Sequence, residues 1–416
     1  MIKDVLFVCE DNAALSQIAE AILSGAAGNS VRAQSVGITP LHQVDRDVVR
    51  LMSKQGIDLA DRTTRDVQSI VDQSFDYVIT IGDVARDQTP DLRGNPRRIH
   101  WRTPGSSPHL EQAVSEIENE LASLLLYIEK YPTARELHFQ PGCASIFASP
   151  GTFISAEHLP LAAEAGFKCF EMCCYLSLES FDFTEEKNVI EFLRISNDLG
   201  MPIFSVHAPY YLFDSKEDDP AHVKKVNESM KHFADLAAEN GIQVVVMHVK
   251  CSSHLSQEQH DAQVLEQLLD LQDYILPLPC VFGWENVDQP YPEKHLEIIR
   301  SLNPGAFQFV LDTGHSNMDN YGARDPEDPD PTGFTERYMA NCNLRLSSLH
   351  LHDNDGKEDS HKLLGDGTID WKTFRKQLVS VGYTGPLMIE CYPGLQGCDD
   401  LKQYLNDGLM SLENLR

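Results

Sequence analysis

Short apolar runs that end on an acidic or imidazole side chain recur along the later two-thirds of this chain. Turn residues bound each run, and segments with helical periodicity separate it from the next one. Apolar runs of this length are typical of strands buried in a parallel sheet. Eight such strands are predicted, at Ala144–Ala148, Cys169–Cys173, Ile203–His207, Val244–His248, Val281–Glu285, Phe307–Asp312, Ser347–His352 and Leu387–Cys391.

Helical periodicity fills the intervals between these strands. Connections through helices make consecutive strands parallel. The helices are predicted at Ala156–Ala165, Glu185–Leu199, Ala221–Asn240, Glu258–Tyr274, Pro292–Ser301, Phe334–Cys342, Trp371–Val381 and Asp399–Leu412. Eight strand–helix units in about 280 residues match the size of a (β/α)8 TIM barrel, which places the chain in the α/β class.

The first 132 residues show a smaller alternation of the same kind. Strand patterns occur at Val5–Cys9, Val31–Val36, Tyr77–Ile81 and Arg98–Trp101, and helical patterns at Ser16–Ser24, Asp45–Gln55, Arg65–Val71 and Leu110–Lys130. This alternation predicts a small doubly wound parallel sheet. A stretch with two prolines and a glycine follows it. We therefore predict a first domain at 1–132, a linker at 133–142 and the barrel at 143–416.

Acidic and imidazole side chains stand at the ends of five successive strands of the predicted barrel. The carboxyl ends of barrel strands meet at one rim, where such folds place their active sites. The side chains expected to converge there are Glu285, Asp312, His350 and Glu390. Several carboxylates packed together require a cation. Mixed imidazole and carboxylate ligands suit Zn²⁺, Mn²⁺ or Co²⁺ better than Ca²⁺.

Four sequence motifs in the barrel resemble those of the xylose-isomerase-like TIM-barrel superfamily. The most specific motif is HLHDNDGKEDSHKLLGDGTIDW at His350–Trp371. The others are WENV at Trp284–Val287, LDTGH at Leu311–His315 and MIE at Met388–Glu390. That superfamily contains sugar isomerases and epimerases, inosose dehydratase-like enzymes and endonuclease IV. The resemblance implies a metal-dependent enzyme.

The resemblance also implies sets of metal ligands. Endonuclease IV binds three zinc ions, and the matching positions are His207, His248 and Glu285 for one ion, Glu285, Asp312, His350 and Glu390 for a second, and His315, Asp359 and His361 for a third. The isomerase relatives hold a single metal at the second set. One to three divalent ions, Zn²⁺ or Mn²⁺, are therefore expected. In the alternative, His207 and His248 bind substrate oxygens, while Asp359 and His361 order a loop beside His315.

Three functions are consistent with this barrel. The favoured one is a metal-dependent isomerase or epimerase of a sugar or sugar derivative, with Glu285 and Glu390 exchanging the proton. Further candidates for substrate binding are Trp284, Glu171, Lys250 and His352. The first alternative is a multinuclear zinc phosphodiesterase like endonuclease IV. The second is a non-catalytic, metal-binding sensor or scaffold.

The first predicted domain resembles the low-molecular-weight tyrosine phosphatase and arsenate reductase family. Its first strand ends in CEDNAALS, where Cys9, Asn12 and Ser16 match the nucleophile, the Asn and the Ser of the family's anion-binding loop. The family's Arg is replaced by Leu15, although that Arg holds the anion and lowers the thiol pKa. The resolving cysteines and the general acid of the family are missing as well. The resemblance therefore implies a non-catalytic domain; the alternative keeps Cys9 as a redox-sensitive thiol.

Composition limits the partners and the compartment. The net charge of −29 falls mostly after residue 132 and disfavours nucleic acid, whose binding requires a basic surface. Ten cysteines without a CxxC pair are typical of a reduced, cytoplasmic protein. No apolar run reaches the roughly 20 residues of a membrane span, and no signal peptide is expected. A small-molecule substrate, in a monomer or a homo-oligomer, is the expected partner.

Overall fold

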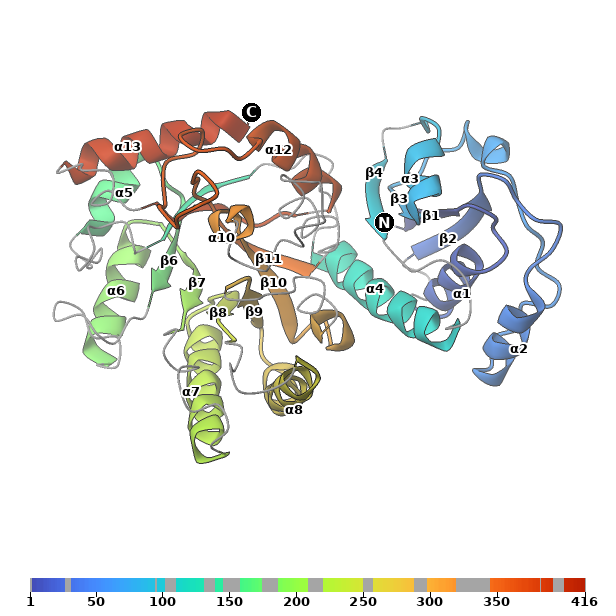
Figure 1. Ribbon diagram of the computed structural model, residues 1–416, viewed down its shortest axis with the longest axis horizontal. Helices are drawn as coiled ribbons and strands as arrows, with labels where there is room; N and C mark the ends of the chain where they lie inside the picture. The colour runs from blue at the N-terminus through green and yellow to red at the C-terminus, as the bar shows by residue number, and fades with distance from the viewer. Residues whose placement is uncertain are drawn as a thin grey trace. The chain divides into compact units, whose positions relative to one another are not determined.

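The structure is a computed structural model, and it describes residues 2–26, 31–93, 96–101, 110–130, 139–144, 158–173, 186–208, 220–249, 257–287, 298–318, 345–381, 383–391 and 400–415. The chain divides into two compact units; most of the first consists of residues 1–137, and the second takes nearly all of the remaining chain. Each unit is an α/β structure built on a parallel sheet, as the sequence predicts (Figure 1).

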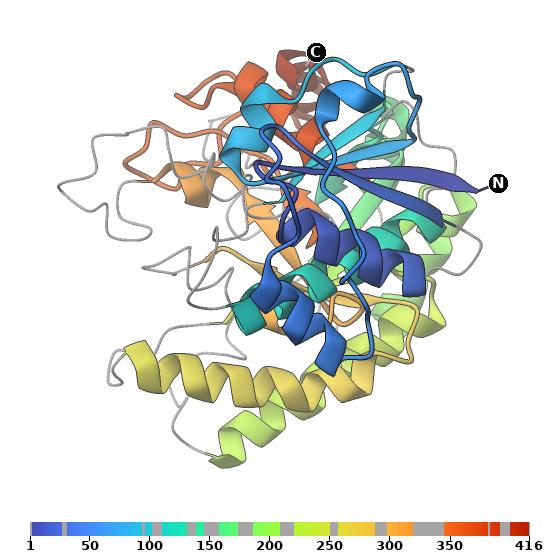
Figure 2. The same cartoon turned by 90° about the vertical axis from the view of Figure 1, so that its right-hand side faces the viewer.

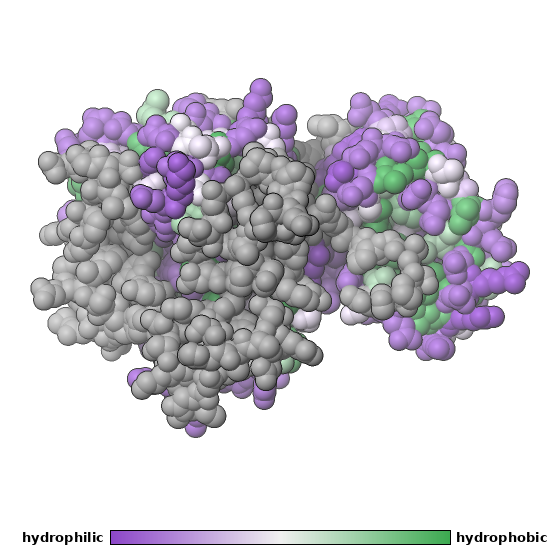
Figure 3. Space-filling model, in the orientation of Figure 1, coloured by the Kyte–Doolittle hydropathy of each residue, from purple (hydrophilic) through white to green (hydrophobic). Residues whose placement is uncertain are grey.

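The first unit contains a four-stranded parallel sheet in the order β2-β1-β3-β4. Its strands are β1 (Lys3–Cys9), β2 (Val31–Gly37), β3 (Tyr77–Ile81) and β4 (Arg97–Trp101). Its helices are α1 (Leu15–Ala26), α2 (Arg46–Lys54), the 3-10 turn η1 (Val67–Ile70), α3 (Asp83–Gln88) and α4 (Leu110–Lys130). Hydrophilic side chains cover much of the surface of this unit that Figure 3 shows.

Both faces of this sheet are buried, which explains the continuous apolar character of β1. Val5 and Phe7 point to one face and pack with α1 and α4. Leu6 and Val8 point to the other face and pack with η1 and α3. Successive strand residues alternate between faces, so helices on both sides demand apolar residues at every position. The predicted doubly wound sheet is confirmed.

Two local features of the first unit differ from the prediction. The helix expected at Arg65–Val71 is only the single turn η1, because the carboxylate of Asp66 accepts a hydrogen bond from Gln68 N at 2.7 Å and Ser69 Oγ bonds back to the Asp66 carbonyl. Short polar side chains that bond their own backbone favour turns over helix. The short helix α3 follows β3 and was not predicted.

The second unit is an eight-stranded parallel barrel with the strand order β11-β10-β9-β8-β7-β6-β5-β12. Its strands are β5 (Pro141–Ala144), β6 (Cys169–Cys173), β7 (Ile203–His207), β8 (Val244–Met247), β9 (Val281–Glu285), β10 (Phe307–Asp312), β11 (Leu346–His350) and β12 (Leu387–Ile389). The TIM barrel predicted from the sequence is therefore confirmed.

Helices surround these strands (Figure 1). They are α5 (Leu159–Ala165), α6 (Glu186–Asp198), α7 (Pro220–Glu239), α8 (Gln257–Ile275), α10 (Thr313–Asn317), α12 (Trp371–Ser380), α13 (Leu401–Ser411) and the 3-10 turn η7 (Leu412–Leu415). Helices α7 and α8 lie side by side (Figure 2), and Asn227 Nδ2 donates to Asp270 Oδ2 at 2.9 Å between them. No helix among the described residues has the length and apolarity that a membrane span requires.

The barrel is nearly closed at a seam between β11 and β12. These two strands lie at the ends of the sheet order, and a single bridge between Leu351 and Ile389 joins them. Leu351 N donates to Met388 O at 2.8 Å, and Glu390 N donates to Leu351 O at 3.0 Å. The seam therefore lies directly beside His350 and Glu390.

The first barrel strand begins earlier than predicted. It spans Pro141–Ala144 and so begins within the last two residues of the segment expected as a linker, whereas the predicted strand covered Ala144–Ala148. A Cβ on Gly142 would lie 3.0 Å from Cys169 Sγ and from Met388 Sδ, so glycine lets β5 fit between its neighbours. Residues 145–148, the helix predicted at Phe334–Cys342 and part of the one at Pro292–Ser301 lie outside the described residues.

Candidate metal centre

Buried imidazole and carboxylate side chains gather at the carboxyl ends of the barrel strands. Asp312 and His350 are the last residues of β10 and β11, Glu285 is the last of β9, and Glu390 follows β12. Their ligand atoms all lie within 4.8 Å of one another. A second group, of the three residues His207, Glu285 and His350, shares two members with the first. The structure thus brings together the four side chains expected to converge.

The imidazole of His350 lies between three carboxylates. Its Nδ1 is 3.2 Å from Glu285 Oε1 and 3.2 Å from Glu390 Oε2. Its Nε2 is 3.0 Å from Glu171 Oε1. Burial alone lowers the pKa of His350, but the charges of these carboxylates raise it well above its usual value. Burial likewise opposes ionisation of Glu171, yet the charges of the neighbouring imidazoles lower its pKa overall.

The two glutamates beside His350 have opposite protonation tendencies. Burial raises the pKa of Glu390 well above its usual value, and the charges of Glu285 and Asp312 add to this effect. Burial also acts on Glu285, but the charges of His350 and His248 hold its pKa well below the usual value. A pair of carboxyl groups with divergent pKa values provides one proton donor and one acceptor.

His207 and His248 both contact the same oxygen of Glu285. Their Nε2 atoms lie 3.1 Å and 2.8 Å from Glu285 Oε2. The Nδ1 of His207 lies 2.8 Å from the carbonyl oxygen of Ala208, so this nitrogen carries the hydrogen. In the neutral ring, Nε2 then presents a lone pair to a carboxylate. Two electron-rich atoms at this distance require a proton or a metal cation between them.

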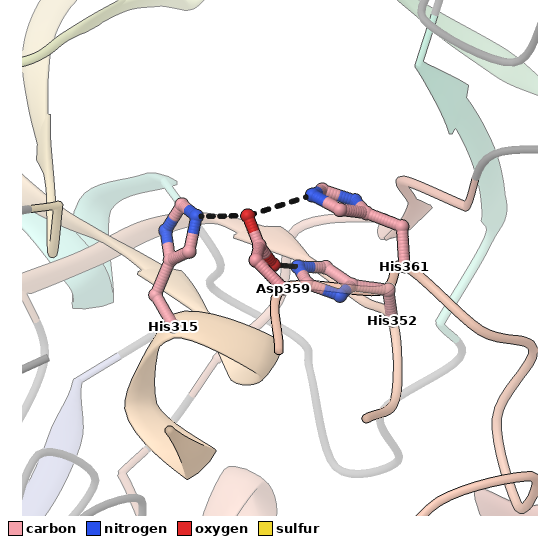
Figure 4. A group of neighbouring side chains, drawn as sticks. All are labelled: His315, His352, Asp359 and His361. Carbon is pink, nitrogen blue, oxygen red and sulfur yellow. Dashed lines mark hydrogen bonds and ion pairs between the residues drawn. The ribbon is translucent and has the colours of Figure 1, made fainter. Parts of the chain in front are cut away.

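A second cluster adjoins the first and consists of His315, His352, Asp359 and His361 (Figure 4). The Nε2 atoms of His315 and His361 lie 3.3 Å and 3.2 Å from Asp359 Oδ2. The ring of His352 stacks on that of His361, with centroids 3.7 Å apart. The Nδ1 of His361 contacts the carbonyl oxygen of Glu390 at 2.6 Å, so its Nε2 faces Asp359 as the Nε2 of His207 faces Glu285.

His352 connects the two clusters. Its Nε2 lies 2.9 Å from Asp312 Oδ1 and 3.9 Å from Asp359 Oδ1. Burial raises the pKa of Asp312, but His315 and His352 lower it to about 2. Burial lowers the pKa of His361, as does the charge of the stacked His352. The structure therefore places His352 against a candidate ligand, Asp312.

Asp353 organises the loop that carries Asp359 and His361. Its wholly buried carboxylate accepts four hydrogen bonds, from Asn354 N at 2.9 Å, Gly365 N at 2.9 Å, Ile369 N at 3.3 Å and Trp371 Nε1 at 2.8 Å. These donors span most of the loop, so one side chain fixes its path. The motif that contains Asp353 is recognisable in the sequence, but the role of Asp353 was not predicted.

Asn286 is a second residue that sequence reasoning missed. Its side chain donates to Asp312 O at 2.9 Å and accepts from Asp312 N at 2.7 Å. This pair of bonds fixes the backbone from which the Asp312 carboxylate projects. The only available signal was its place in WENV, directly after Glu285.

The residues predicted to bind substrate have different surroundings. Trp284 is wholly buried on β9, and strand alternation directs it to the face opposite Glu285. Glu171 is wholly buried against His350. His352 contacts Asp312, and Lys250 lies outside the described residues.

The three matching residues of the phosphatase-like loop do come together in the first unit. Cys9 Sγ lies 2.9 Å from Ser16 Oγ and accepts from Asn12 N at 3.1 Å. Asp11 Oδ1 accepts from Ala13 N at 2.9 Å and lies 3.6 Å from Cys9 Sγ. Burial raises the pKa of the Cys9 thiol; the hydrogen bond to Ser16 opposes this, and the charge of Asp11 adds to it.

Each of the two units matches the sequence model of a known protein family. Residues 159–414 match the sequence model of the xylose isomerase-like TIM barrel family. The chain belongs to this family. Residues 4–103 match the model of the low molecular weight phosphotyrosine protein phosphatases.

Individual relatives cover one unit each. An uncharacterized protein of Methanocaldococcus jannaschii is 24% identical over 280 residues, which are 64% of this chain and 88% of that protein. An arsenate reductase of Brevibacillus brevis is 32% identical over 99 residues, which are 24% of this chain and 73% of the enzyme.

Solved structures share the barrel fold. A D-tagatose 3-epimerase-like protein has a TM-score of 0.51 and 22% identity, over 66% of this chain and 98% of its own. The IOLI protein, solved with a zinc atom, has a TM-score of 0.52 and 14% identity, over 66% and 98% of the two chains. At these identities the likeness establishes the fold alone.

Proposed function

We propose that the barrel is a metal-dependent isomerase or epimerase that acts on a sugar or sugar derivative. One observation carries the proposal: the carboxylates of Glu285 and Glu390 both lie 3.2 Å from the same nitrogen of His350, so two groups able to transfer protons face one site. Sugar isomerisation and epimerisation need a base that removes a proton from carbon and an acid that supplies one. The D-tagatose 3-epimerase-like protein with the same fold supports this reaction class.

The donor set fits a divalent metal. Three carboxylates and one imidazole meet within ligand distance in a buried site. Three imidazoles of the site have one ring nitrogen held by the protein and the other facing a carboxylate. A backbone carbonyl holds Nδ1 of His207 and of His361, and the carboxylate of Glu171 holds Nε2 of His350. Imidazoles that bind metals are usually held in this way. The ligands assigned to this ion are Glu285, Asp312, His350 and Glu390.

The reaction divides between the ion and the protein. A bound cation would polarise adjacent carbonyl and hydroxyl oxygens of the sugar. Glu285, held ionised by His350 and His248, accepts the proton from the carbon beside the carbonyl. Glu390, whose pKa burial raises, would return a proton to that carbon. The burial of both groups excludes water that would otherwise compete for the proton.

The second cluster favours an alternative function. Three imidazoles and one carboxylate suit a further zinc ion, and His315 Nδ1 lies only 3.4 Å from Glu285 Oε1. Metal ions bound close together are typical of enzymes that hydrolyse phosphodiesters. The net charge of −29 opposes a nucleic-acid substrate, so this function ranks second.

The first domain is assigned no catalysis in this proposal. Leu15 occupies the position of the anion-binding Arg and packs against the hydrophobic core. The carboxylate of Asp11 accepts a backbone N–H of the loop and places a negative charge beside Cys9. A phosphate or arsenate ion would be repelled from this loop.

Metal analysis combined with a substrate panel tests the proposal. We expect the full-length protein to bind Zn²⁺ or Mn²⁺, to interconvert ketose epimers, and to lose activity on chelation. Glu285→Gln should abolish turnover, whereas Glu164→Gln, on the exposed surface beside Lys402, should not. Nicking of abasic-site DNA that disappears in Glu285→Gln, without turnover of any sugar, would replace the isomerase by the phosphodiesterase.

A further inference from the structure

Glu171 is an acidic residue buried at the centre of the barrel and outside the groups of candidate ligands. It is the middle residue of β6 and is 0% exposed. Its Oε1 lies 3.0 Å from His350 Nε2, and its Oε2 accepts a hydrogen bond from Ser205 Oγ on the neighbouring strand β7. Both oxygens therefore already have partners within the protein.

We propose that Glu171 is a positioning residue that aligns His350 for metal binding. The inference rests on the proposed function, because the residue that Glu171 aligns, His350, is one of the four proposed ligands of the metal ion. An imidazole that binds a metal is neutral and carries one ring hydrogen; because a carboxylate only accepts hydrogen bonds, the contact with Glu171 places that hydrogen on Nε2 in the metal-bound state. The lone pair of Nδ1 then points between Glu285 and Glu390, where the ion binds.

The comparison with the other imidazoles of the site supports this role. His207 and His361 have their Nδ1 atoms fixed by backbone carbonyl oxygens, at 2.8 Å and 2.6 Å. His350 instead uses a buried carboxylate for the same purpose. A charged partner strengthens the imidazole as a donor to the metal more than a neutral carbonyl does. The ion would offset the cost of burying one more negative charge.

A substrate contact, which the sequence predicts for Glu171, fits the geometry less well. The side chain has no exposed surface, and a sugar hydroxyl would have to displace either His350 or Ser205 from it. Breaking the contact with His350 would disturb a metal ligand. The arrangement therefore favours a fixed structural contact over an exchangeable one.

The hydroxyl of Ser205 makes Glu171→Gln an informative variant. Ser205 Oγ donates to Oε2, so in the variant the amide oxygen remains with Ser205. The amide NH₂ group then faces His350 Nε2 and requires a lone pair there. The imidazole hydrogen moves to Nδ1, where it blocks the metal. In serine proteases, replacing the aspartate that contacts the catalytic histidine by asparagine likewise leaves the geometry intact but selects the wrong tautomer and greatly lowers kcat.

The test measures metal binding directly on the full-length protein, with Co²⁺ and Zn²⁺ as probes. Competition with a chromophoric chelator gives the dissociation constant, and the visible spectrum of bound Co²⁺ reports the ligand geometry. We expect Glu171→Gln to bind each ion ten- to a hundredfold more weakly, with an altered Co²⁺ spectrum. The value of kcat for an active sugar should fall, while KM changes little.

Two control variants separate this role from general damage. Glu164→Gln removes an exposed carboxylate of the barrel, and Ser347→Ala removes a buried hydroxyl that bonds to Phe309 O. Both should bind metal as the wild type does. Ser205→Ala should weaken metal binding less than Glu171→Gln, because the carboxylate stays in place.

The outcomes distinguish the inference from the proposed function. Unchanged metal affinity and an unchanged Co²⁺ spectrum in Glu171→Gln, together with a raised KM, would make Glu171 a substrate contact and overturn the positioning role alone. Failure of the wild-type protein to bind any divalent ion would overturn both. Circular dichroism of each variant verifies that a loss of binding does not come from unfolding.

Discussion

The imidazole of His352 occupies the space that a side chain at position 314 would need. A Cβ on Gly314 would lie 1.8 Å from His352 Cε1, far inside any allowed contact. Glycine in the motif LDTGH therefore allows His352 to approach Asp312, to within 2.9 Å. The turn after β10 and the loop after β11 are thus fitted to each other at the metal centre.

Gly314→Ala should displace His352 from both clusters. Overpacking of this kind costs about 1–3 kcal/mol of stability. We expect a lower melting temperature and less metal bound at the second cluster, measured by calorimetry and elemental analysis. Gly25→Ala is the matched control, because nothing lies within 4 Å of its added Cβ. Equal metal content in the two variants would contradict the role assigned to His352.

Glu285→Gln should affect chemistry and metal binding together. Glu285 lies beside the imidazoles of four residues, so loss of its charge removes their anionic partner: His207, His248, His315 and His350. We expect kcat to fall by about 10²–10⁴-fold, as for loss of a general base. Steady-state assays at saturating metal separate lost chemistry from lost ion. Full activity under these conditions would exclude Glu285 as the base.

The thiol of Cys169 should make the barrel sensitive to alkaline pH. Burial first, and then the charge of Glu171, raise its pKa from 9.0 to about 12. The folded state thus favours the protonated thiol, and this stability is present below pH 9 and lost as the pH rises towards 12. The total loss is roughly 4 kcal/mol, because a difference of one in pKa between the folded and unfolded states corresponds to about 1.4 kcal/mol.

Urea unfolding of the wild type and of Cys169→Ser across this pH range measures the effect. The variant should start from a lower stability but should lose less of it with rising pH. Cys280→Ser is a graded control, since burial raises the pKa of Cys280 only to about 11. Parallel stability curves for wild type and Cys169→Ser above pH 9 would contradict the linkage.

Cys9 should be a poorly reactive thiol. Its pKa lies above the ordinary value, mainly because the group is buried and also because of the charge of Asp11. The thiolate is the nucleophile, so alkylation by iodoacetamide near neutral pH should be slower than that of free cysteine. Mass spectrometry of the Cys9 peptide over time gives the rate. Reaction faster than free cysteine would instead support a redox role.

Strand positions were predictable wherever burial on both faces left an uninterrupted apolar run. The ranges Cys169–Cys173, Ile203–His207, Val281–Glu285 and Phe307–Asp312 are observed as predicted. The start of the first barrel strand was predicted too late because Pro141 and Gly142 indicate a turn locally, whereas pairing with its neighbours β12 and β6 makes Pro141–Ala144 a strand. Long-range pairing of this kind leaves no local pattern.

The residue types of the metal centre were predictable from the sequence, but the contacts that hold those residues in place were not. Ligand types at strand ends follow from the closure of the barrel, so Glu285, Asp312 and His350 could be named in advance. Asp353 forms hydrogen bonds as far along the chain as Trp371, and Glu171 meets His350 from another strand. Contacts between such distant positions depend on the folded geometry, which no spacing in the sequence specifies.

The single bridge that closes the barrel has a consequence for how an ion would be held. His350 precedes this seam on one strand and Glu390 follows it on the other, and the amides of Leu351 and Glu390 supply its hydrogen bonds. Transient separation of these two strands would pull two ligands apart. A bound ion would thus act as a cross-link, and amide hydrogen exchange at Leu351 and Glu390 would slow when metal is added.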